Sequence, residues 1–400
     1  MEERKRMSIN IRGRSRLRNV AAALLVMASG IALSACGSGS SASETSSTAG
    51  SGGSKTSTLA GVPSLEELYK GTEEAPPTGG PAAAKGKSIV WISCGQVAEG
   101  CAAPSAAAGE AAKDLGWGFK LLDAKFGAGG AFGAAIRQAI VLKPDAIVVL
   151  AINCDAAQQP MQEAKQAGIP VLGVLNKDCD AKLQPIPMIP NSTSATTADF
   201  WTNYGAQKAA YIIHKTDGKA KVINMWFKDN LTEINDGFTA MLKKCQGCQV
   251  VGDLPFLAPE QAPGGPLAQR FTTTLARHPD ANAFTISADA PLIGSGLAAK
   301  MNSMPSAKKL VSIAGEGSGY GMDLLRKDGV PTAENGYDNA WLGYAAMDSI
   351  NRFFANTPAV PEGFGSRIVD RQNNMTAEGP YASPIDFKSA YRKVWDGSGS

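Results

Sequence analysis

Cys36, near the amino terminus, has the surroundings of a thiol that receives a lipid. Four arginines between residues 12 and 18 lead into an apolar run of fourteen residues, 20–33, and Leu33-Ser34-Ala35 stands directly before the cysteine. This run is short for a bilayer-spanning helix, and the pattern is typical of an export signal with a cut site. We expect residues 1–35 to be removed and Cys36 to carry a diacylglyceryl thioether that anchors the protein. An uncleaved anchor is the alternative.

The other six cysteines favour disulfides, because an exported chain enters an oxidising compartment. Proximity in the sequence favours the pairs Cys94–Cys101 and Cys245–Cys248, which leaves Cys154–Cys179. The Cys245-Gln246-Gly247-Cys248 spacing also occurs in redox motifs. Here it lies between a predicted helix and a predicted strand, so we expect a structural disulfide.

Patterns for catalysis or for metal binding are weak in this sequence. The two histidines, His214 and His278, are far apart and close to predicted helix ends, where capping or surface roles are common. The glycine-rich residues 315–319 lack the lysine of a phosphate-binding loop and the full dinucleotide-binding spacing. We therefore expect no enzymatic activity, no metal and no cofactor.

The composition is that of an ordinary globular protein. Removal of the signal leaves 400 − 35 = 365 residues, enough for two domains. With 19% charged residues and a formal net charge of +3, nothing points to nucleic acid as a partner. Residues 37–61 are almost all Gly, Ser, Thr and Ala, and residues 75–87 are rich in Pro, Gly and Ala. We expect residues 36–86 to be a lipidated, flexible tether.

From residue 87 the sequence alternates between predicted strands and helices. The strands are short apolar runs rather than alternating patterns, which indicates parallel sheets covered on both faces. The first array has strands at 88–93, 119–122, 146–150 and 169–174, with helices at 105–115, 131–142 and 156–167. A second array has strands at 221–226, 249–254, 283–287 and 309–314, with helices at 197–214, 231–244, 265–277 and 291–301. The sequence thus predicts an α/β fold with two Rossmann-like lobes.

Polar residues follow several of these strands, where ligands bind in open parallel sheets. Asn176, Lys177 and Asp178 follow the strand at 169–174, and Asp229 and Asn230 follow the strand at 221–226. A carboxylate or amide beside a cation can bind two vicinal hydroxyls of a sugar. The alternatives are a solvated turn for the first group and a helix N-cap for the second.

The chain from 87 to 395 resembles the type I periplasmic binding protein superfamily. Four segments, together with Cys36, carry the resemblance: residues 143–149 (KPDAIVV), 167–171 (AGIPV), 235–238 (NDGF) and 278–281 (HPDA). It is strongest to the ribose-, rhamnose- and autoinducer-2-binding lipoproteins of ABC importers. The resemblance implies two lobes joined by three hinge crossovers, with a ligand cleft between them. It implies a first lobe of residues 87–191 plus 316–366 and a second lobe of residues 192–315 plus 367–400.

The resemblance also implies ligand contacts. Asp289 and Glu316 match acidic positions of relatives, Tyr337 and Asp338 match an aromatic residue followed by Asp, and Asp338 is the principal candidate. The full candidate set is Gln96, Asn176, Lys177, Asp178, Trp226, Asp229, Asn230, Asp289, Glu316, Tyr337 and Asp338. Ile234 and Ala288 stand where ribose binders have arginine and asparagine, so ribose itself is not expected.

The function implied is that of a monomeric solute-binding lipoprotein on the outer face of the cytoplasmic membrane. It would capture a small sugar or polyol-like solute and deliver it to an ABC permease. The acidic excess among the candidate residues disfavours an anionic solute, fits neutral polyols and leaves room for an amine. The alternatives are a ligand-sensing lipoprotein that signals to a membrane receptor and, less supported, an exported enzyme.

Overall fold

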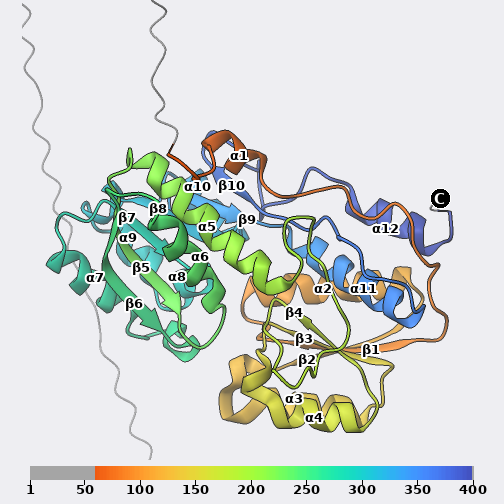
Figure 1. Ribbon diagram of the computed structural model, residues 1–400. Helices are drawn as coiled ribbons and strands as arrows, with labels where there is room; N and C mark the ends of the chain where they lie inside the picture. Colours follow the sequence, from red (N-terminus) through yellow and green to blue (C-terminus); the bar gives the residue numbers. More distant parts are fainter. Residues whose placement is uncertain (1–58, 399–400) are drawn as a thin grey trace, which may run out of the picture. The chain divides into compact units, whose positions relative to one another are not determined.

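The computed structural model describes residues 59–398 of the protein (Figure 1). The predicted signal segment, Cys36 and most of the Gly/Ser-rich stretch lie outside the described residues. Among the residues from 59 to 398, no helix combines the length and the apolar character that crossing a bilayer requires.

The first lobe is built on a sheet of four parallel strands in the order β2-β1-β3-β4. Its strands are β1 (Ser88–Ser93), β2 (Gly118–Asp123), β3 (Ala146–Leu150) and β4 (Val171–Val174). Alternate residues of each strand face opposite ways, so Trp91 and Val90 of β1 lie in different hydrophobic clusters. Both faces of β1, β3 and β4 are buried, which explains their continuous apolar sequences, whereas the edge strand β2 is partly exposed.

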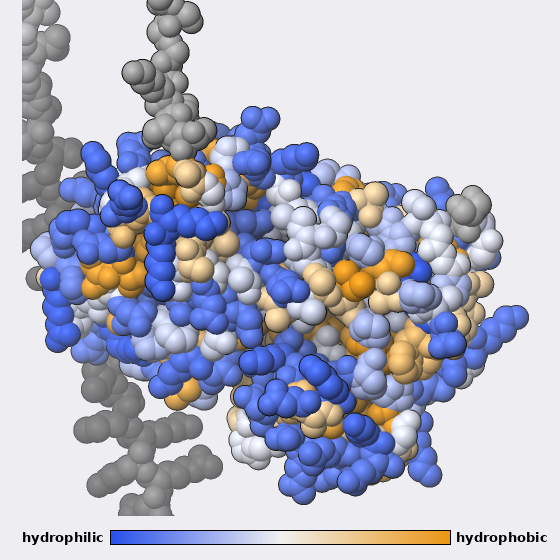
Figure 2. Space-filling view, in the orientation of Figure 1, coloured by the Kyte–Doolittle hydropathy of each residue, from blue (hydrophilic) through white to orange (hydrophobic). Residues whose placement is uncertain are grey.

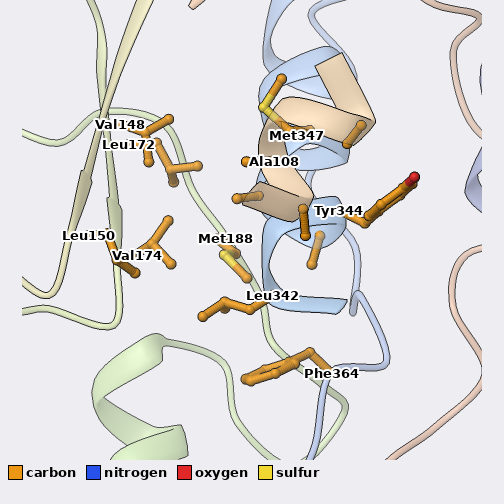
Figure 3. Close-up of a cluster of buried hydrophobic side chains, with 14 of the residues drawn as sticks. Ala108, Val148, Leu150, Leu172, Val174, Met188, Leu342, Tyr344, Met347 and Phe364 are labelled. Atoms are coloured by element: carbon orange, nitrogen blue, oxygen red, sulfur yellow. The ribbon is translucent and has the colours of Figure 1, made fainter. Parts of the chain in front are cut away.

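Helices cover both faces of this sheet. On one face lie α2 (Glu99–Asp114) and α11 (Asn339–Phe354), and Figure 3 shows Leu342 and Met347 of α11 gathered opposite the strand side chains Val148 and Val174. On the other face lie α3 (Ala131–Val141) and α4 (Gln158–Gln166).

The second lobe is built on a sheet of six strands in the order β10-β9-β8-β7-β5-β6, in which only β10 is antiparallel to its neighbour. Its strands are β5 (Lys221–Phe227), β6 (Gln249–Phe256), β7 (Ala283–Ile286), β8 (Val311–Glu316), β9 (Ala333–Gly336) and β10 (Arg367–Asp370). One face packs on α5 (Thr197–Lys215) and α6 (Thr232–Leu242). The other packs on α7 (Leu267–Arg277), α8 (Ala290–Gly294) and α9 (Leu297–Asn302). The prediction of two α/β lobes is confirmed.

The boundaries expected for the lobes differ from the observed course of the chain. After β8, the helix α10 (Gly319–Arg326) and β9 remain in the second lobe, because β9 pairs with both β8 and β10. The assignment of residues 316–336 to the first lobe is therefore wrong, and the chain returns there only with α11.

The carboxyl-terminal helix α12 (Phe387–Trp395) also lies in the lobe opposite to the one expected. Tyr391 and Trp395 belong to the hydrophobic cluster of the first lobe, and Trp395 Nε1 donates to Asp348 of α11 at 2.7 Å. The chain thus crosses between the lobes once more after β10, in addition to the three crossovers expected.

Residues 59–86, expected to be part of a flexible tether, form an ordered segment that we call the strap. In the strap, α1 (Leu65–Lys70) begins at a Ser64 cap and buries Leu68 in the second lobe. The Thr72 amide then donates to Ser366 O at 2.9 Å, and further on the Ala83 amide donates to Trp395 O at 2.8 Å. The strap therefore touches the second lobe, the crossover segment and the first lobe in turn, as its path along the body in Figure 1 shows.

The three disulfides have the expected pairing. Cys94–Cys101 joins the end of β1 to the first turn of α2, Cys154–Cys179 joins the segments after β3 and β4, and Cys245–Cys248 closes the turn between α6 and β6. Two of the three bridges thus lie at the carboxyl ends of the strands in the first lobe.

Candidate functional site

A cavity of about 290 Å³ lies between the two lobes. The first lobe contributes Cys94, Ala151 and Leu175, which directly follow β1, β3 and β4. The second lobe contributes Phe227, at the end of β5, and Glu316, at the end of β8. The carboxyl ends of strands from both sheets therefore meet at this cavity, as expected for open parallel sheets.

The backbone around the cavity is unusually strained. Five lining residues that are not glycine have a left-handed φ: Phe126 (52°), Ala151 (51°), Leu175 (52°), Leu231 (54°) and Glu316 (84°). Such conformations cost free energy for residues with a side chain and cluster at ligand-binding sites. The loops at the strand ends are thus held in the shape of the cavity by the surrounding structure.

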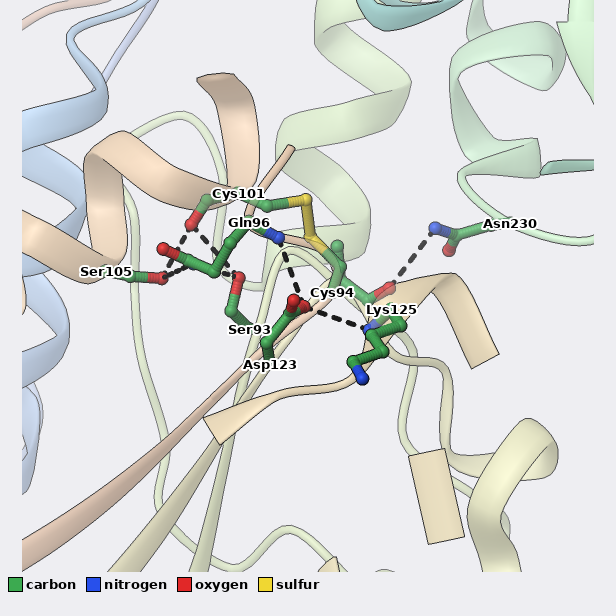
Figure 4. Close-up of a disulfide and its surroundings, with 9 residues drawn as sticks. Ser93, Cys94, Gln96, Cys101, Ser105, Asp123, Lys125 and Asn230 are labelled. Atoms are coloured by element: carbon green, nitrogen blue, oxygen red, sulfur yellow. Dashed lines mark hydrogen bonds between the residues drawn. A yellow bond between two sulfur atoms is a disulfide. The ribbon is translucent and has the colours of Figure 1, made fainter. Parts of the chain in front are cut away.

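Phe126 reaches the cavity from the segment η1 (Lys125–Gly130), which follows β2. The Asp123 carboxylate accepts from the amides of Gln96, at 3.1 Å, and Lys125, at 3.0 Å, and so ties this segment to the loop after β1 (Figure 4). A Cβ at Gly95 would lie 2.5 Å from the Phe126 ring, so the position of the ring depends on glycine there.

Glu316 is the buried acid of the cavity wall, with 9% of its surface exposed. Its amide donates to the Tyr204 hydroxyl at 2.8 Å, and a Cβ on Gly100 of α2 would lie 2.0 Å from its Oε2. Burial, reinforced by the negative charge of Asp289, raises the pKa of Glu316 to about 8. At neutral pH the carboxyl is therefore mainly protonated and can donate a hydrogen bond to a ligand.

Glu316 adjoins a buried cluster of charged groups. Asp289 accepts from the amides of Gly315, at 3.1 Å, and Ser318, at 3.0 Å, and so fixes the turn between β8 and α10. Lys208 of α5 donates to the carbonyls of Ile286, at 2.8 Å, and Ser287, at 3.2 Å. Burial lowers the pKa of Lys208 to about 8 and raises that of Glu334 well above its usual value. This cluster supports the cavity wall from behind.

Hydrogen bonds also join the lobes beside the cavity. The Gly319 amide of the second lobe donates to both carboxylate oxygens of Glu99 in α2, at 2.9 Å each. Asn230 Nδ2 donates to the Ala151 carbonyl of the first lobe at 3.4 Å (Figure 4). The structure therefore has the two lobes in contact across the cleft.

Four of the predicted ligand residues line the cavity: Asp229, Asn230, Glu316 and Tyr337. Seven do not: Gln96, Asn176, Lys177, Asp178, Trp226, Asp289 and Asp338. The predicted strand ends thus border the cavity, but seven of the eleven predicted residues do not line it.

Of these seven side chains, that of Lys177 is exposed, and the other six make hydrogen bonds within the protein. Gln96 donates to Ser93 Oγ at 2.6 Å (Figure 4), Asn176 donates to Ile152 O at 2.8 Å, and Trp226 donates to Asp253 at 2.8 Å. The Asp178 carboxylate accepts from the amides of Cys179, at 2.7 Å, and Leu183, at 3.1 Å. Its role is to hold the turn after β4.

Asp338, expected to be the principal ligand contact, instead caps a helix. Its carboxylate accepts from the amides of Ala340, at 2.9 Å, and Trp341, at 3.2 Å, at the start of α11, and from Ser383 at 3.0 Å. An Asp before a helix satisfies the amide groups that the first turn leaves unpaired. The structure thus favours a structural role for this residue.

We expect Asp338→Ala to lower the free energy of unfolding by about 2 kcal/mol, through loss of the cap. Asp338→Asn should recover much of this stability, because the amide oxygen can accept the same bonds. Urea unfolding measures both effects, and titration calorimetry with a solute that binds the wild type should give unchanged affinity. If the variant instead bound the solute more weakly and had wild-type stability, Asp338 would be a ligand contact and not a structural cap.

Four polar residues of the cavity were absent from the predicted set: Asn153, Trp201, Gln261 and Ser287. Trp201 of α5 and Gln261, which follows β6, both line the cavity and are nearly buried. Trp201 lies in the middle of a helical pattern, and Gln261 lies in a Pro-rich stretch without periodicity, so neither has a local signal that separates it from core or surface.

Within residues 59–398, the group of side chains with a spacing suited to a metal is Cys154, Asp178 and Cys179. Because the two sulfur atoms are joined in a disulfide, they offer no thiolate to a metal.

Comparisons with known proteins agree with this architecture. A family model described as "Periplasmic binding protein domain" matches residues 90–356. Among curated proteins, no sequence matches this chain.

Solved structures share the fold at low sequence identity. One is an ABC transporter solute-binding protein from Agrobacterium vitis bound with alpha-D-tagatopyranose, with 19% identity, a TM-score of 0.63, and coverage of 74% of this chain and 100% of that one. Another, from Burkholderia graminis in complex with D-arabinose, has 20% identity, a TM-score of 0.61, and coverage of 74% and 99%. A third, a transporter solute-binding protein from Thermotoga lettingae in complex with 5-methylthioribose, has 16% identity, a TM-score of 0.60, and coverage of 80% and 100%.

The family model spans more than half of the chain, and it covers the strands of the first sheet and most of those of the second. Together with the two parallel sheets and the cavity between them, this match shows that the chain belongs to the periplasmic binding protein family, in its type I form.

Proposed function

We propose that this protein is the extracytoplasmic solute-binding component of an ABC importer, anchored through Cys36. In this role it captures a small solute of the sugar or polyol type between its lobes and delivers it to a membrane permease. The observation that carries the proposal is the cavity, whose wall is made by strand ends of both lobes. Solved structures with the same fold are described with bound tagatopyranose, arabinose or 5-methylthioribose, which supports the solute class.

The mechanism that this geometry supports is a hinged clamp. A solute that contacts both walls gains all its contacts only when the lobes are together, so it shifts the population toward the closed form. Two hydrogen bonds between the lobes, Glu99–Gly319 and Asn230–Ala151, also stabilise the closed form. The closed, loaded form then presents surfaces of both lobes to the permease.

The segments that cross between the lobes are packed by aromatic rings. Phe200 and Tyr337 lie 6.2 Å apart between ring centroids, and Phe200 and Phe364 lie 4.9 Å apart. All three belong to the hydrophobic cluster that continues into the first lobe. Because this cluster is continuous, opening of the cleft is expected to pivot there rather than to separate the lobes.

A thermal-shift screen of the purified protein against sugars, polyols, autoinducer-2 and amines tests solute capture. A solute present at about 100 times its Kd should stabilise the protein by about 2.7 kcal/mol. Deletion of the gene should then abolish uptake of the labelled solute by cells. Uptake that persists while a response to the solute is lost would indicate sensing instead of import.

A further inference from the structure

The wall of the interlobe cavity is mainly apolar. Phe126 and Phe132 from the first lobe and Phe227 and Leu231 from the second line it, together with several alanines. The outer surface differs, because Figure 2 shows hydrophilic residues over most of the visible face and apolar residues only in small groups. The cavity therefore offers a solute chiefly apolar surface.

Three polar side chains of the wall, those of Asn153, Asp229 and Asn230, already have partners within the protein. Asn153 Oδ1 accepts from the Lys177 amide at 3.0 Å, and Asp229 accepts from the Ala258 amide at 3.4 Å. Asn230 donates to Ala151 O and accepts from the Leu231 amide at 3.0 Å. Most of the rest of the wall is apolar, so a solute with hydroxyls on all sides would leave those that face Phe126, Phe132 and Phe227 without partners, which is costly for buried groups.

Five polar side chains of the wall make no hydrogen bond among the described residues and remain for a solute: Trp201, Gln261, Ser287, Glu316 and Tyr337. Trp201 Nε1, a donor, and Gln261 Oε1, an acceptor, are buried and have no hydrogen-bond partner among residues 59–398. The Glu316 carboxyl lies in the same wall, at the end of β8, where the Glu316 backbone has a left-handed φ. Buried polar atoms are rarely left unpaired, so these groups suit one or two hydrogen-bonding atoms of a ligand.

The charge of the wall also restricts the solute. Among the described residues that line the cavity there is no lysine, arginine or histidine, so an anionic group would be buried without a counter-charge. Besides Glu316, the wall has one acidic side chain, Asp229, which already accepts a hydrogen bond from the protein. These features favour a neutral solute over an anion or a cation.

Resting on the solute-binding function proposed above, we infer that the cavity takes a neutral, amphipathic solute. Its aryl, cycloalkyl or branched alkyl body lies against Phe126, Phe132 and Phe227. One hydrogen-bonding end, with one or two hydroxyl or carbonyl groups, meets Glu316, Trp201 and Gln261. Within the sugar- or polyol-type class proposed above, members with fewer hydroxyls or with an added apolar group therefore bind this site more tightly than unsubstituted monosaccharides and polyols.

Titration calorimetry of the purified protein with matched probes tests this inference. The first pair is cyclohexane-1,2-diol and inositol, which share a ring and differ in hydroxyl groups. The second pair is phenyl glucoside and glucose. In each pair we expect the more apolar member to bind at least about tenfold more tightly, with a negative heat-capacity change. 2-Phenylethanol should likewise bind more tightly than phenylacetate and phenylethylamine, which carry charges.

The outcomes separate this inference from the proposed function. Tighter binding of inositol and glucose than of their apolar partners would overturn the inference and leave solute capture intact. Preference for phenylacetate or phenylethylamine would overturn the neutrality of the solute. No binding by any of these probes at millimolar concentration would overturn both the inference and the proposed solute capture.

A variant locates the binding in the cavity. Phe126→Ala should weaken binding of the apolar probes by about tenfold, because it removes an aromatic ring from the wall. Phe353→Ala is the matched control, since Phe353 lies on the surface of α11 and does not line the cavity. Equal affinity of the Phe126→Ala variant and the wild type would contradict the assigned position of the apolar body.

Discussion

Replacement of Glu73 by alanine is expected to lower the free energy of unfolding by about 3 kcal/mol, because it leaves the positive charge of Arg367 largely buried and unpaired. The Glu73 side chain connects the strap to β10 and to the segment that follows it. Its carboxylate forms an ion pair with Arg367 of β10 and accepts from Tyr381, at 2.7 Å, and Ser383, at 3.1 Å. The Glu73 side chain has no exposed surface, and that of Arg367 is 15% exposed.

The strap itself should loosen in this variant. Backbone bonds pair Thr72 with Ser366 and Glu74 with Gly363, and they lie on either side of Glu73. Once the carboxylate is lost, trypsin should cut more rapidly at Lys85 and Lys87, where the strap reaches the first lobe. Urea unfolding and limited proteolysis measure the two effects.

Two variants serve as controls for this prediction. Glu66→Ala changes an exposed residue of α1 and should alter stability by no more than about 0.5 kcal/mol. Glu73→Gln keeps an acceptor for Tyr381 and Ser383 and should lie between the wild type and Glu73→Ala. Wild-type stability and proteolysis of Glu73→Ala would show that the strap is held without this ion pair.

Glu316→Gln is expected to flatten the dependence of stability on pH between about 5 and 8. The pKa of Glu316 is raised from 4.5 to about 8 by burial and by the charge of Asp289, so the folded protein keeps a proton that the unfolded chain releases. This contribution to stability is full below the unfolded pKa and is lost as the pH rises through the folded pKa. One such proton corresponds to about 1.4 kcal/mol per pH unit.

Urea unfolding at pH 5.5 and 7.5 measures this effect. The wild type should lose about 2 kcal/mol more than Glu316→Gln over this interval. Burial raises the pKa of Asp289 and Glu334 as well; both are present in wild type and variant, so only the part of their titration that depends on the charge of Glu316 differs between the two proteins.

Lys208 does not account for the same slope. Its pKa is lowered from 10.5 to about 8, so its contribution to stability is lost as the pH falls from 10.5 toward 8, above the interval measured. Glu66→Gln, at an exposed position, is the control and should keep the wild-type slope. Equal slopes for Glu316→Gln and the wild type would mean that Glu316 is ionised in the folded protein.

The sequence by itself determined the strand arrays and therefore the two α/β lobes. Short apolar runs such as 146–150 specify buried parallel strands locally, because both faces of each strand must be covered. In the last third of the chain the sequence pattern did not predict β9 and β10. The segments Ala333–Gly336 and Arg367–Asp370 contain too few apolar residues to indicate a strand. Pairing with neighbours already in the sheet makes these segments strands.

The cysteine spacing determined the disulfide pairing, and the strand ends determined the region of the site. Asp229, Asn230, Glu316 and Tyr337 line the cavity because the carboxyl ends of the strands meet there. Only the tertiary structure decided which polar side chains at those ends face the cavity. Asp338 and Asp178 are equally good as ligands or as partners of backbone amides, and packing of the following segment gave them the second role.

Other features of the site have no local signal at all. The sequence predicts a flexible tether over residues 36–86 and gives no role to Lys208 and Glu334. The strap and both side chains are nevertheless placed by contacts with segments far away in the sequence. The apolar character of the cavity likewise comes from Phe126 and Phe227, which are brought together from different lobes. Local periodicity specifies which residues are buried in each element, but the partners of a side chain, and hence the chemistry of the cleft, depend on which elements meet.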